Sequence, residues 1–355
     1  MVRVVTQHKL LNERRQQSTV EEVPYKINGK LEKIEKVYDK GAMNRLELDG
    51  GKLSGEMVVS TDIKREVVQK TVLDVEMGRE AIPLLDGSIY HTISDASLPQ
   101  IVPMSWAQNG AVVFLEHAEG EEIKFGAMQA ETSPMAHLTS YAGGFTWTKE
   151  AEIFSQLYLI GAFNEAFGRA HNMMLNHIHV APIAQFDYKA GNTTKPVYIK
   201  ADGANGTQSD HNRYLSVRET LKAGIRDSRL AKRPGTILLA NSADQQDIEE
   251  ALQGAQIMAT NYGAVAGIDE IIYYDGDEER VGDRHYEFDG VKQGEAFLIR
   301  PQRGFKELVK VPLQIEFEGP DLTRLIQNTM VGYTFRGVYA AVEENVQKIE
   351  LPKSK

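Results

Sequence analysis

The 355-residue sequence contains no cysteine. Disulfide bonds, thiolate catalysis, cysteine-ligated zinc and iron–sulfur clusters are therefore excluded. Long hydrophobic runs are also missing: none reaches the roughly eighteen residues that a membrane-spanning helix needs, so we expect no membrane span. The opening residues have neither the apolar core nor the small-residue cleavage site of a secretory signal, and none is expected.

Positive charge is scarce in one region. With 42% hydrophobic and 25% charged residues, the chain has the composition of an ordinary folded protein, and its net charge is −10. Residues 241–290 carry thirteen acidic residues and two arginines, a net charge of −11, so the remainder is close to neutral. An acidic chain is a poor candidate for tight binding to duplex DNA through its phosphates. We interpret the acidic block as solvated surface.

The strongest pattern is the helical one between Thr146 and Pro182. Apolar residues recur there at steps of three and four, which is the period of an α-helix. Thr148 is a suitable N-cap, and Pro182 is expected to end the helix. The pattern predicts a strut over 149–182, with about thirty residues spanning roughly 45 Å. Its core face is expected to contain Ile153, Leu157, Ile160, Phe163 and Phe167.

Two pairs of glycines interrupt these patterns. Gly161 and Gly168 lie inside the predicted helix, where each costs about 1 kcal/mol, and are expected to allow another backbone to approach closely. Gly143 and Gly144 are not followed by the lysine and serine of a phosphate-binding loop. We expect them to bend or twist an extended segment.

Before the predicted helix, the pattern favours extended structure. Residues 111–148 hold strand-like pieces around a polar turn, which predicts a long two-stranded hairpin. Because a lone hairpin is only marginally stable in water, a long one is expected to lie on another chain. Residues 1–60 have no hydrophobic period long enough to bury themselves and predict an arm. Residues 61–110 predict a helix followed by loop.

After the predicted helix, the chain alternates between element types. Residues 183–300 contain two helical patterns among short strands, including a buried strand at 236–240, and predict a compact α+β domain. Residues 301–355 hold long strands that are expected to return and pair beside the strut. The strut and these strands would form one domain, with 183–300 inserted between them.

This order of elements resembles the major capsid protein of tailed bacteriophages, which has the phage Hong Kong 97-like fold. The resemblance covers about residues 111–350. The stretches that carry it are FTWTKEAEIFSQLYLIGAFNEAFGRAHNMMLNH at the hairpin–helix junction, TILLANSADQQDIEEAL in the inserted domain, and FKELVKVPLQIEFEGPDLTRLIQNTMVGYTFRGVYAAV in the closing strands.

The resemblance implies an α+β fold divided in a particular way. The expected parts are an N-terminal arm at 1–60, the first part of a peripheral domain at 61–110, an extended hairpin loop at 111–148, a spine helix of the peripheral domain at 149–182, an axial domain at 183–300, and C-terminal strands of the peripheral domain at 301–355.

It also implies a structural protein and not an enzyme, with no catalytic residue, cofactor or metal. Copies would assemble into pentamers and hexamers that close an icosahedral head shell around double-stranded DNA, without binding it tightly or specifically. Scaffold, portal and decoration proteins are further candidate partners. The expected location is the virion, after assembly in the host cytoplasm. Within the same fold, an encapsulin-like compartment shell is the alternative.

In such a shell the hairpin would reach over a neighbouring subunit. Some family members weld their shells through an isopeptide bond from a hairpin lysine. Lys124 is the only lysine in 111–148, and we identify no matching asparagine or catalytic glutamate, so welding stays open. The residues expected to contact the neighbour are Glu119, Glu121, Glu122, Lys124 and Phe125.

A histidine-metal hydrolase is the alternative from a different class. Neutral imidazoles bind zinc, and His171, His177 and His179 are the candidate ligands. Six residues along a helix turn through about 600°, so His171 and His177 fall on opposed sides. We interpret the three as polar residues near the helix end. A calcium loop starting at Asp275 is not expected, because Tyr286 occupies its twelfth position.

Overall fold

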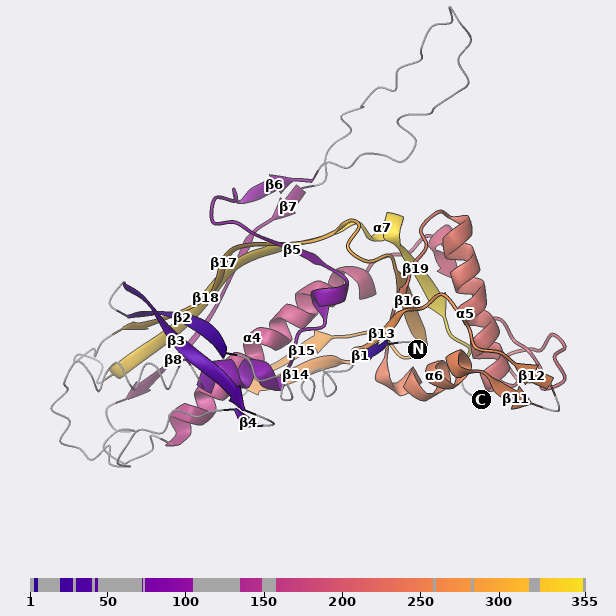
Figure 1. Ribbon diagram of the computed structural model, residues 1–355, viewed down its shortest axis with the longest axis horizontal. Coiled ribbons are helices and arrows are strands. Elements are labelled where there is room, and N and C mark those ends of the chain that lie inside the picture. Colours follow the sequence, from indigo (N-terminus) through magenta and orange to yellow (C-terminus); the bar gives the residue numbers. More distant parts are fainter. Residues whose placement is uncertain are drawn as a thin grey trace, which may run out of the picture.

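Helix α4 (Tyr158–Ala184) is the longest helix of the described residues and links two β-sheets. In the computed structural model, the seven-stranded sheet runs along α4 and the six-stranded sheet lies beyond the C-terminal end of α4 (Figure 1). No helix in the described part of the chain is long and apolar enough to cross a membrane. The structure describes residues 3–5, 20–27, 30–39, 42–43, 72, 74–104, 135–148, 158–257, 260–281, 284–318 and 326–353.

The seven-stranded sheet is built on the long antiparallel pair β17 and β18. Strand β8 pairs antiparallel with β18, and β2 and β5 pair parallel with β17. Side chains on one face of β17 and β18 pack with α4 and with Val72 and Val75. Both valines are helical, and Val75 belongs to the helical residues 74–81. The strands are β2 (Val20–Ile27), β3 (Lys30–Asp39), β4 (Ala42–Met43), β5 (His91–Ser94), β8 (Thr139–Thr148), β17 (Phe305–Glu318) and β18 (Ile326–Ala340).

The six-stranded sheet has the order β1-β13-β10-β16-β19-β9. Its central strands β10 and β13 are parallel and buried at every position. Helices α5 (Arg213–Leu230) and α6 (Gln245–Gln253) cover one face, and the last turns of α4 pack on the other. The strands are β1 (Arg3–Val5), β9 (Thr193–Thr194), β10 (Ile237–Ala240), β13 (Glu270–Tyr273), β16 (Glu295–Ile299) and β19 (Val346–Glu350).

The two helices and the buried strand that the sequence predicted after the strut are confirmed. Asn212 caps α5 by accepting from the Leu215 amide at 3.0 Å. Asn241 follows β10 and accepts from the Ala243 amide at 2.8 Å, which starts the turn into α6. The remaining elements are η1 (Asp86–Ser88), β6 (Ile101–Pro103), β7 (Met135–His137), η2 (Ala190–Asn192), η3 (Ser242–Asp244), β11 (Ala255–Ile257), β12 (Thr260–Tyr262), β14 (Gly276–Val281), β15 (Arg284–Asp289) and α7 (Val342–Asn345).

The expected division of the chain needs two corrections. Strands β1 and β19, expected in the arm and the peripheral domain, complete the six-stranded sheet. Strand β8, expected as one side of the hairpin, pairs with β18 from Arg336–Thr139 to Ile326–Thr148. In both cases a backbone edge that sequence patterns cannot locate provides the hydrogen-bonding partner. The acidic run after Tyr274, for which no element was predicted, forms the two-stranded hairpin β14–β15.

The prediction that Pro182 ends the long helix is wrong. Helix α4 continues through Pro182 to Ala184. Proline removes one backbone donor, and so close to the end this affects a single bond. The Gln185 amide still donates to the Ala181 carbonyl at 2.9 Å, which completes the last turn.

The expected core face of the helix is also wrong in part. Phe163 is 55% exposed, and Phe167 is only partly buried. Ile153 and Leu157 lie outside the described residues, as does the side chain of Ile160. The face that is buried is rich in polar side chains: Asn164, His171, Asn172, Asn176 and His179. Two of these side chains, Asn172 and Asn176, bond to backbone groups of the segment that α4 covers, which explains the polar residues at these two positions.

Glycines set how closely α4 approaches its neighbours. A Cβ on Gly168 would stand 1.9 Å from the Val75 carbonyl oxygen, so the two helices touch through their backbones. This confirms the close approach predicted at Gly168. Gly143 and Gly332 face each other across β8 and β18, and the Phe167 ring covers both. Gly143 therefore makes room for a ring, a role that the sequence did not indicate.

We predict that Gly168→Ala destabilises the protein by about 1–3 kcal/mol, despite the better helix propensity of alanine, because the methyl group collides with backbone. Thermal unfolding followed by circular dichroism measures this. Gly87→Ala is the matched control, since nothing lies within 4 Å of its added Cβ. Equal melting temperatures for both variants would contradict the close helix crossing.

Candidate functional site

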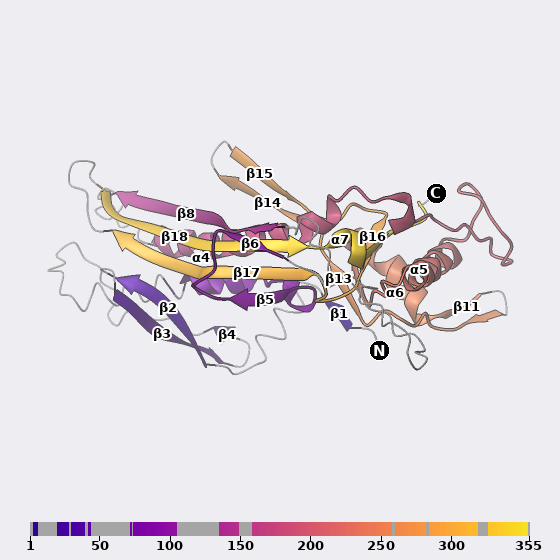
Figure 2. The same cartoon turned by 90° about the horizontal axis from the view of Figure 1, so that it is seen from above.

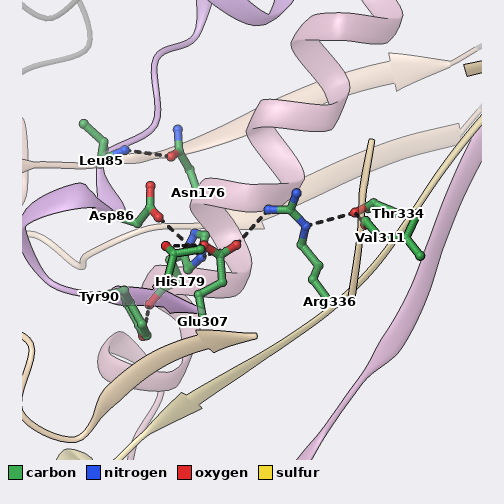
Figure 3. A network of polar contacts seen from close by, with 10 residues as sticks. Leu85, Asp86, Tyr90, Asn176, His179, Glu307, Val311, Thr334 and Arg336 are labelled. Atoms are coloured by element: carbon green, nitrogen blue, oxygen red, sulfur yellow. Dashed lines mark hydrogen bonds and ion pairs between the residues drawn. The ribbon is translucent and has the colours of Figure 1, made fainter. Parts of the chain in front are cut away.

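The polar face of α4 contributes to a buried group of charged side chains, here called the ionic network: Asp86, His179, Glu307 and Arg336. Their exposures are only 8%, 2%, 4% and 7%. They come from η1, α4, β17 and β18, so segments more than two hundred residues apart converge (Figure 3). Charges this deeply buried are tolerated only when they are paired and hydrogen-bonded.

Glu307 is the centre of the network. Its Oε1 accepts from Arg336 Nη1 at 2.7 Å and lies 3.3 Å from His179 Nε2. Its Oε2 accepts from the Thr92 hydroxyl at 2.9 Å. On the other side, His179 Nε2 lies 3.7 Å from Asp86 Oδ2. Two carboxylates are thus held together by one guanidinium and one imidazole.

The surroundings of Glu307 determine its protonation. Burial alone would raise the pKa of its carboxyl group, but His179, Arg336 and Thr92 together outweigh burial and lower the pKa from 4.5 to about 2. The Tyr90 hydroxyl lies beside the network and donates to the His179 carbonyl oxygen at 2.7 Å. Burial raises the pKa of Tyr90, so it remains a neutral donor.

A second layer of polar contacts lies one turn earlier on α4. Asn172 Nδ2 donates to the carbonyl oxygens of Arg79 and Ile82, at 2.6 and 2.8 Å. Asn176 Oδ1 accepts from the Leu85 amide at 3.1 Å. These side chains satisfy backbone groups of the segment that leads from the helical residues 74–81 to η1. The segment is thereby attached to α4 without repetitive secondary structure.

The three histidines, expected to be polar residues near the helix end, have different surroundings, and two of them are buried. His171 is buried beside Asn172, and burial, with Arg79 and Arg336 nearby, lowers its pKa from 6.5 to about 3. His177 is partly buried and packs against the Phe288 ring at 5.4 Å. Only His179 belongs to the ionic network.

The network contains three groups of the types that bind metals. Ligand atoms of Asp86, His179 and Glu307 lie within 4.8 Å of one another. However, the Glu307 oxygen nearest His179 already accepts from Arg336. A divalent ion would stand beside this guanidinium and be repelled by it. We therefore interpret the arrangement as a structural ion cluster that fixes α4 against β17, β18 and η1.

The sequence contains weak indications of these residues. Glu307 and Arg336 stand in strand-like stretches, FKELVKV and GYTFRGVYAAV, at positions that face the core. A charged residue at a core position of a strand predicts a buried partner. No comparable pattern identified Asp86, because η1 has no regular period.

The expected intersubunit residues Glu119, Glu121, Glu122, Lys124 and Phe125 lie outside the described residues. The structure does describe the start and the end of their segment. Strands β6 and β7 pair antiparallel, with Pro103 opposite Met135. Residues 105–134 are therefore inserted between two paired strands. Met135 and Ile101 at this base are 57% and 47% exposed.

No protein-family model and no curated protein matches the sequence. Solved structures do match. The capsid structure of the cyanophage P-SCSP1u has a TM-score of 0.50 and 13% identity, covering 77% of this chain and 89% of that one. A virus-like particle from Pyrococcus furiosus has a TM-score of 0.48 and 8% identity, covering 80% and 100%. The mature capsid of bacteriophage PhiM1 has a TM-score of 0.46 and 9% identity, covering 77% and 88%.

The cyanophage match confirms the fold that the order of elements predicted. The chain has the α+β fold of phage capsid subunits, the phage Hong Kong 97-like fold. At 13% identity, this likeness concerns the fold.

We predict that Glu307→Gln costs about 3–5 kcal/mol, because it leaves Arg336 buried without a charged partner. Chemical denaturation at pH 7 measures the loss. Glu316→Gln is the control on the same strand, where the partly exposed carboxylate accepts from the Tyr333 hydroxyl. The folded pKa of Glu307 lies below its ordinary value, so its contribution is present above about pH 4.5 and is lost as the pH falls towards 2. Glu307→Gln should flatten the decline in that window, and an unchanged decline would contradict the network.

A second prediction concerns His171. Because its folded pKa is lowered, the unfolded chain takes up a proton that the folded chain refuses. Stability contributed by neutral His171 is present above pH 6.5 and is lost as the pH falls towards 3. His171→Gln should reduce the loss of stability across this range, whereas exposed His91→Gln should not. Identical pH profiles for both variants would show that His171 is not buried as a neutral base.

Proposed function

We propose that this chain is a major capsid protein, whose copies assemble into pentamers and hexamers of a closed icosahedral shell. The observation that carries the proposal is the fold: the cyanophage capsid subunit aligns over most of both chains, 77% of this one and 89% of that one. A match over most of both chains supports a likeness of the whole fold and not of one common motif. Fold alone does not assign function, so the particular surfaces must support it.

The interior of the subunit suits a mechanical function. One apolar cluster joins the end of α4, through Val180 and Ile183, to the six-stranded sheet, through Phe297 and Ile299. The ionic network fastens the same end of α4, through His179, to the seven-stranded sheet. The two sheets and α4 are thus connected by packed contacts and not by linkers alone. A shell subunit that transmits force between neighbours needs such rigidity.

Residues 105–134 suit contact with a neighbouring copy. The thirty residues that follow β6 and precede β7 are too many for a connection within a compact domain. Their sequence places apolar Val112, Phe114, Ile123 and Phe125 on either side of the polar stretch 118–122. Apolar surface on an excursion needs a partner, and in a closed shell the adjacent subunit supplies it by symmetry.

Several finer parts of the proposal follow from the capsid assignment. The shell would enclose double-stranded DNA without binding it tightly, in keeping with a net charge of −10. Scaffold, portal and decoration proteins are candidate partners, with the virion as the final location and the host cytoplasm as the place of assembly. An encapsulin-like compartment is the alternative, and the nucleic-acid content of purified particles separates the two. Enzymatic function is not proposed, because the charged residues of the network are sealed from substrate.

We predict that replacing residues 105–134 by a short Gly-Ser turn leaves a folded, soluble subunit that no longer closes into shells. The strand pair β6–β7 should survive, since the turn joins strands that are already adjacent. Sedimentation and electron microscopy compare the shortened protein with the parent. Normal closed particles from the shortened chain would contradict the proposed intersubunit function of residues 105–134.

A further inference from the structure

The body built on the six-stranded sheet carries opposite charges at its two ends. Helix α5 runs antiparallel to β10 and β13. Its first residue, Arg213, pairs at 2.7 Å with Asp247, which follows β10. Near its last residue, Arg229 lies over Gly267, which precedes β13: a Cβ there would be 2.8 Å from Arg229 Nη2. The end of α5 therefore lies at the amino ends of the strands, and the acidic residues after β10 and β13 lie at the carboxyl ends.

A basic groove lies at the end of α5. It has a volume of about 440 Å³ and is lined by Lys222, Ile225, Arg226, Arg229, Leu230 and residues 264–266. The three cations follow at steps of four and three, so they share one face of the helix, where like charges repel. Lys222 pairs with Glu219 and Arg226 with Asp227, while Arg229 makes no ion pair within the described residues.

The groove also has the mixed character of an interface. Leu230 is 75% exposed, more than any other large apolar side chain of the described residues. Arginine next to apolar surface is a combination enriched where proteins associate. The groove thus combines Arg229 with two cations that are already ion-paired, Lys222 and Arg226, around a small apolar floor.

The β14–β15 hairpin offers the complementary surface. It starts at Gly276, just beyond the carboxyl end of β13, and Figure 2 shows it projecting along one side of the molecule, away from α5. Phe288 on one face packs against α4 through His177. Side chains alternate across the ribbon, so Glu278 and Glu287 point to the other face.

These two glutamates are crowded. Glu278 lies directly opposite Glu287 in the ladder, and their side chains are 78% and 70% exposed. Like charges directly opposite one another destabilise a β-ladder. Within the described hairpin, His285 lies beside both, at 3.3 and 3.4 Å. Cations of a neighbouring copy would relieve the repulsion between the two glutamates. In turn, the two carboxylates would relieve the repulsion among the cations of the groove.

We infer that the basic groove of one copy docks against the Glu278–Glu287 face of the hairpin of a neighbouring copy. The two surfaces lie at opposite ends of the same body, so the contact is head-to-tail, and it forms a ring where the rotation between copies closes. This inference rests on the proposed capsid function, in which the ring is a capsomer. Complementary charge at its contacts would set the direction in which copies join and speed their encounter.

Charge reversal and its rescue test the contact. The groove variant carries Arg226→Glu and Arg229→Glu, the hairpin variant carries Glu278→Lys and Glu287→Lys, and a third protein carries all four. We expect each double variant to form at least tenfold fewer rings or shells than the parent, and the quadruple variant to recover to within about threefold. Sedimentation velocity and electron microscopy count the particles. Lys292→Glu with Lys353→Glu, at exposed positions, is the control with the same change of charge as the groove variant.

The outcomes separate this inference from the proposed function. If the parent forms shells and the double variants also assemble normally, the docking is overturned and the capsid function stands. The same conclusion follows if the quadruple variant assembles no better than the double variants. A parent that never associates would overturn both. Circular dichroism checks that each variant folds. Should a reversal unfold the protein, Arg226→Gln with Arg229→Gln is used, and unchanged assembly of that variant at 50 and 500 mM salt would equally overturn the docking.

Discussion

Burying Glu307 is the constraint on which much of this structure depends. A carboxylate only 4% exposed requires compensation, and Arg336, His179 and Thr92 supply it from three other elements. Each partner is effective only when its own element is correctly placed. The register of β17 on β18, the rotation of α4 and the position of β5 are therefore coupled through one side chain. Removing a single partner leaves a buried charge, which is costlier than replacing the whole cluster by apolar residues.

The close contact between α4 and the helical residues 74–81 reinforces the same arrangement. Gly78 and Gly168 let the two backbones touch, where any side chain would collide with a carbonyl oxygen. Asn172 and Asn176 can then reach the backbone of the segment that continues to η1. That segment carries Asp86 into the ionic network. Backbone contact and ionic contact therefore act on the same two pieces of chain.

Sequence patterns predicted those parts of the fold that depend on local period. The long helix, α5, α6 and β10 each show a regular apolar spacing or a cap such as Asn241. The order of these elements was enough to suggest the capsid fold that the cyanophage structure confirms. Most of the cluster around Glu307 could not be predicted, since it depends on which strands lie beside α4. Phe163 fits the apolar period of the helix, yet it is 55% exposed and packs only against the Phe145 ring among the described aromatic contacts.

Electron microscopy of the purified protein tests whether copies of this chain close into shells. We expect closed particles of uniform diameter, whose reconstruction has icosahedral symmetry and places the six-stranded sheets around the five-fold and local six-fold axes. A protein that remains monomeric or forms only small symmetric oligomers across protein concentration and salt would contradict the proposed capsid function.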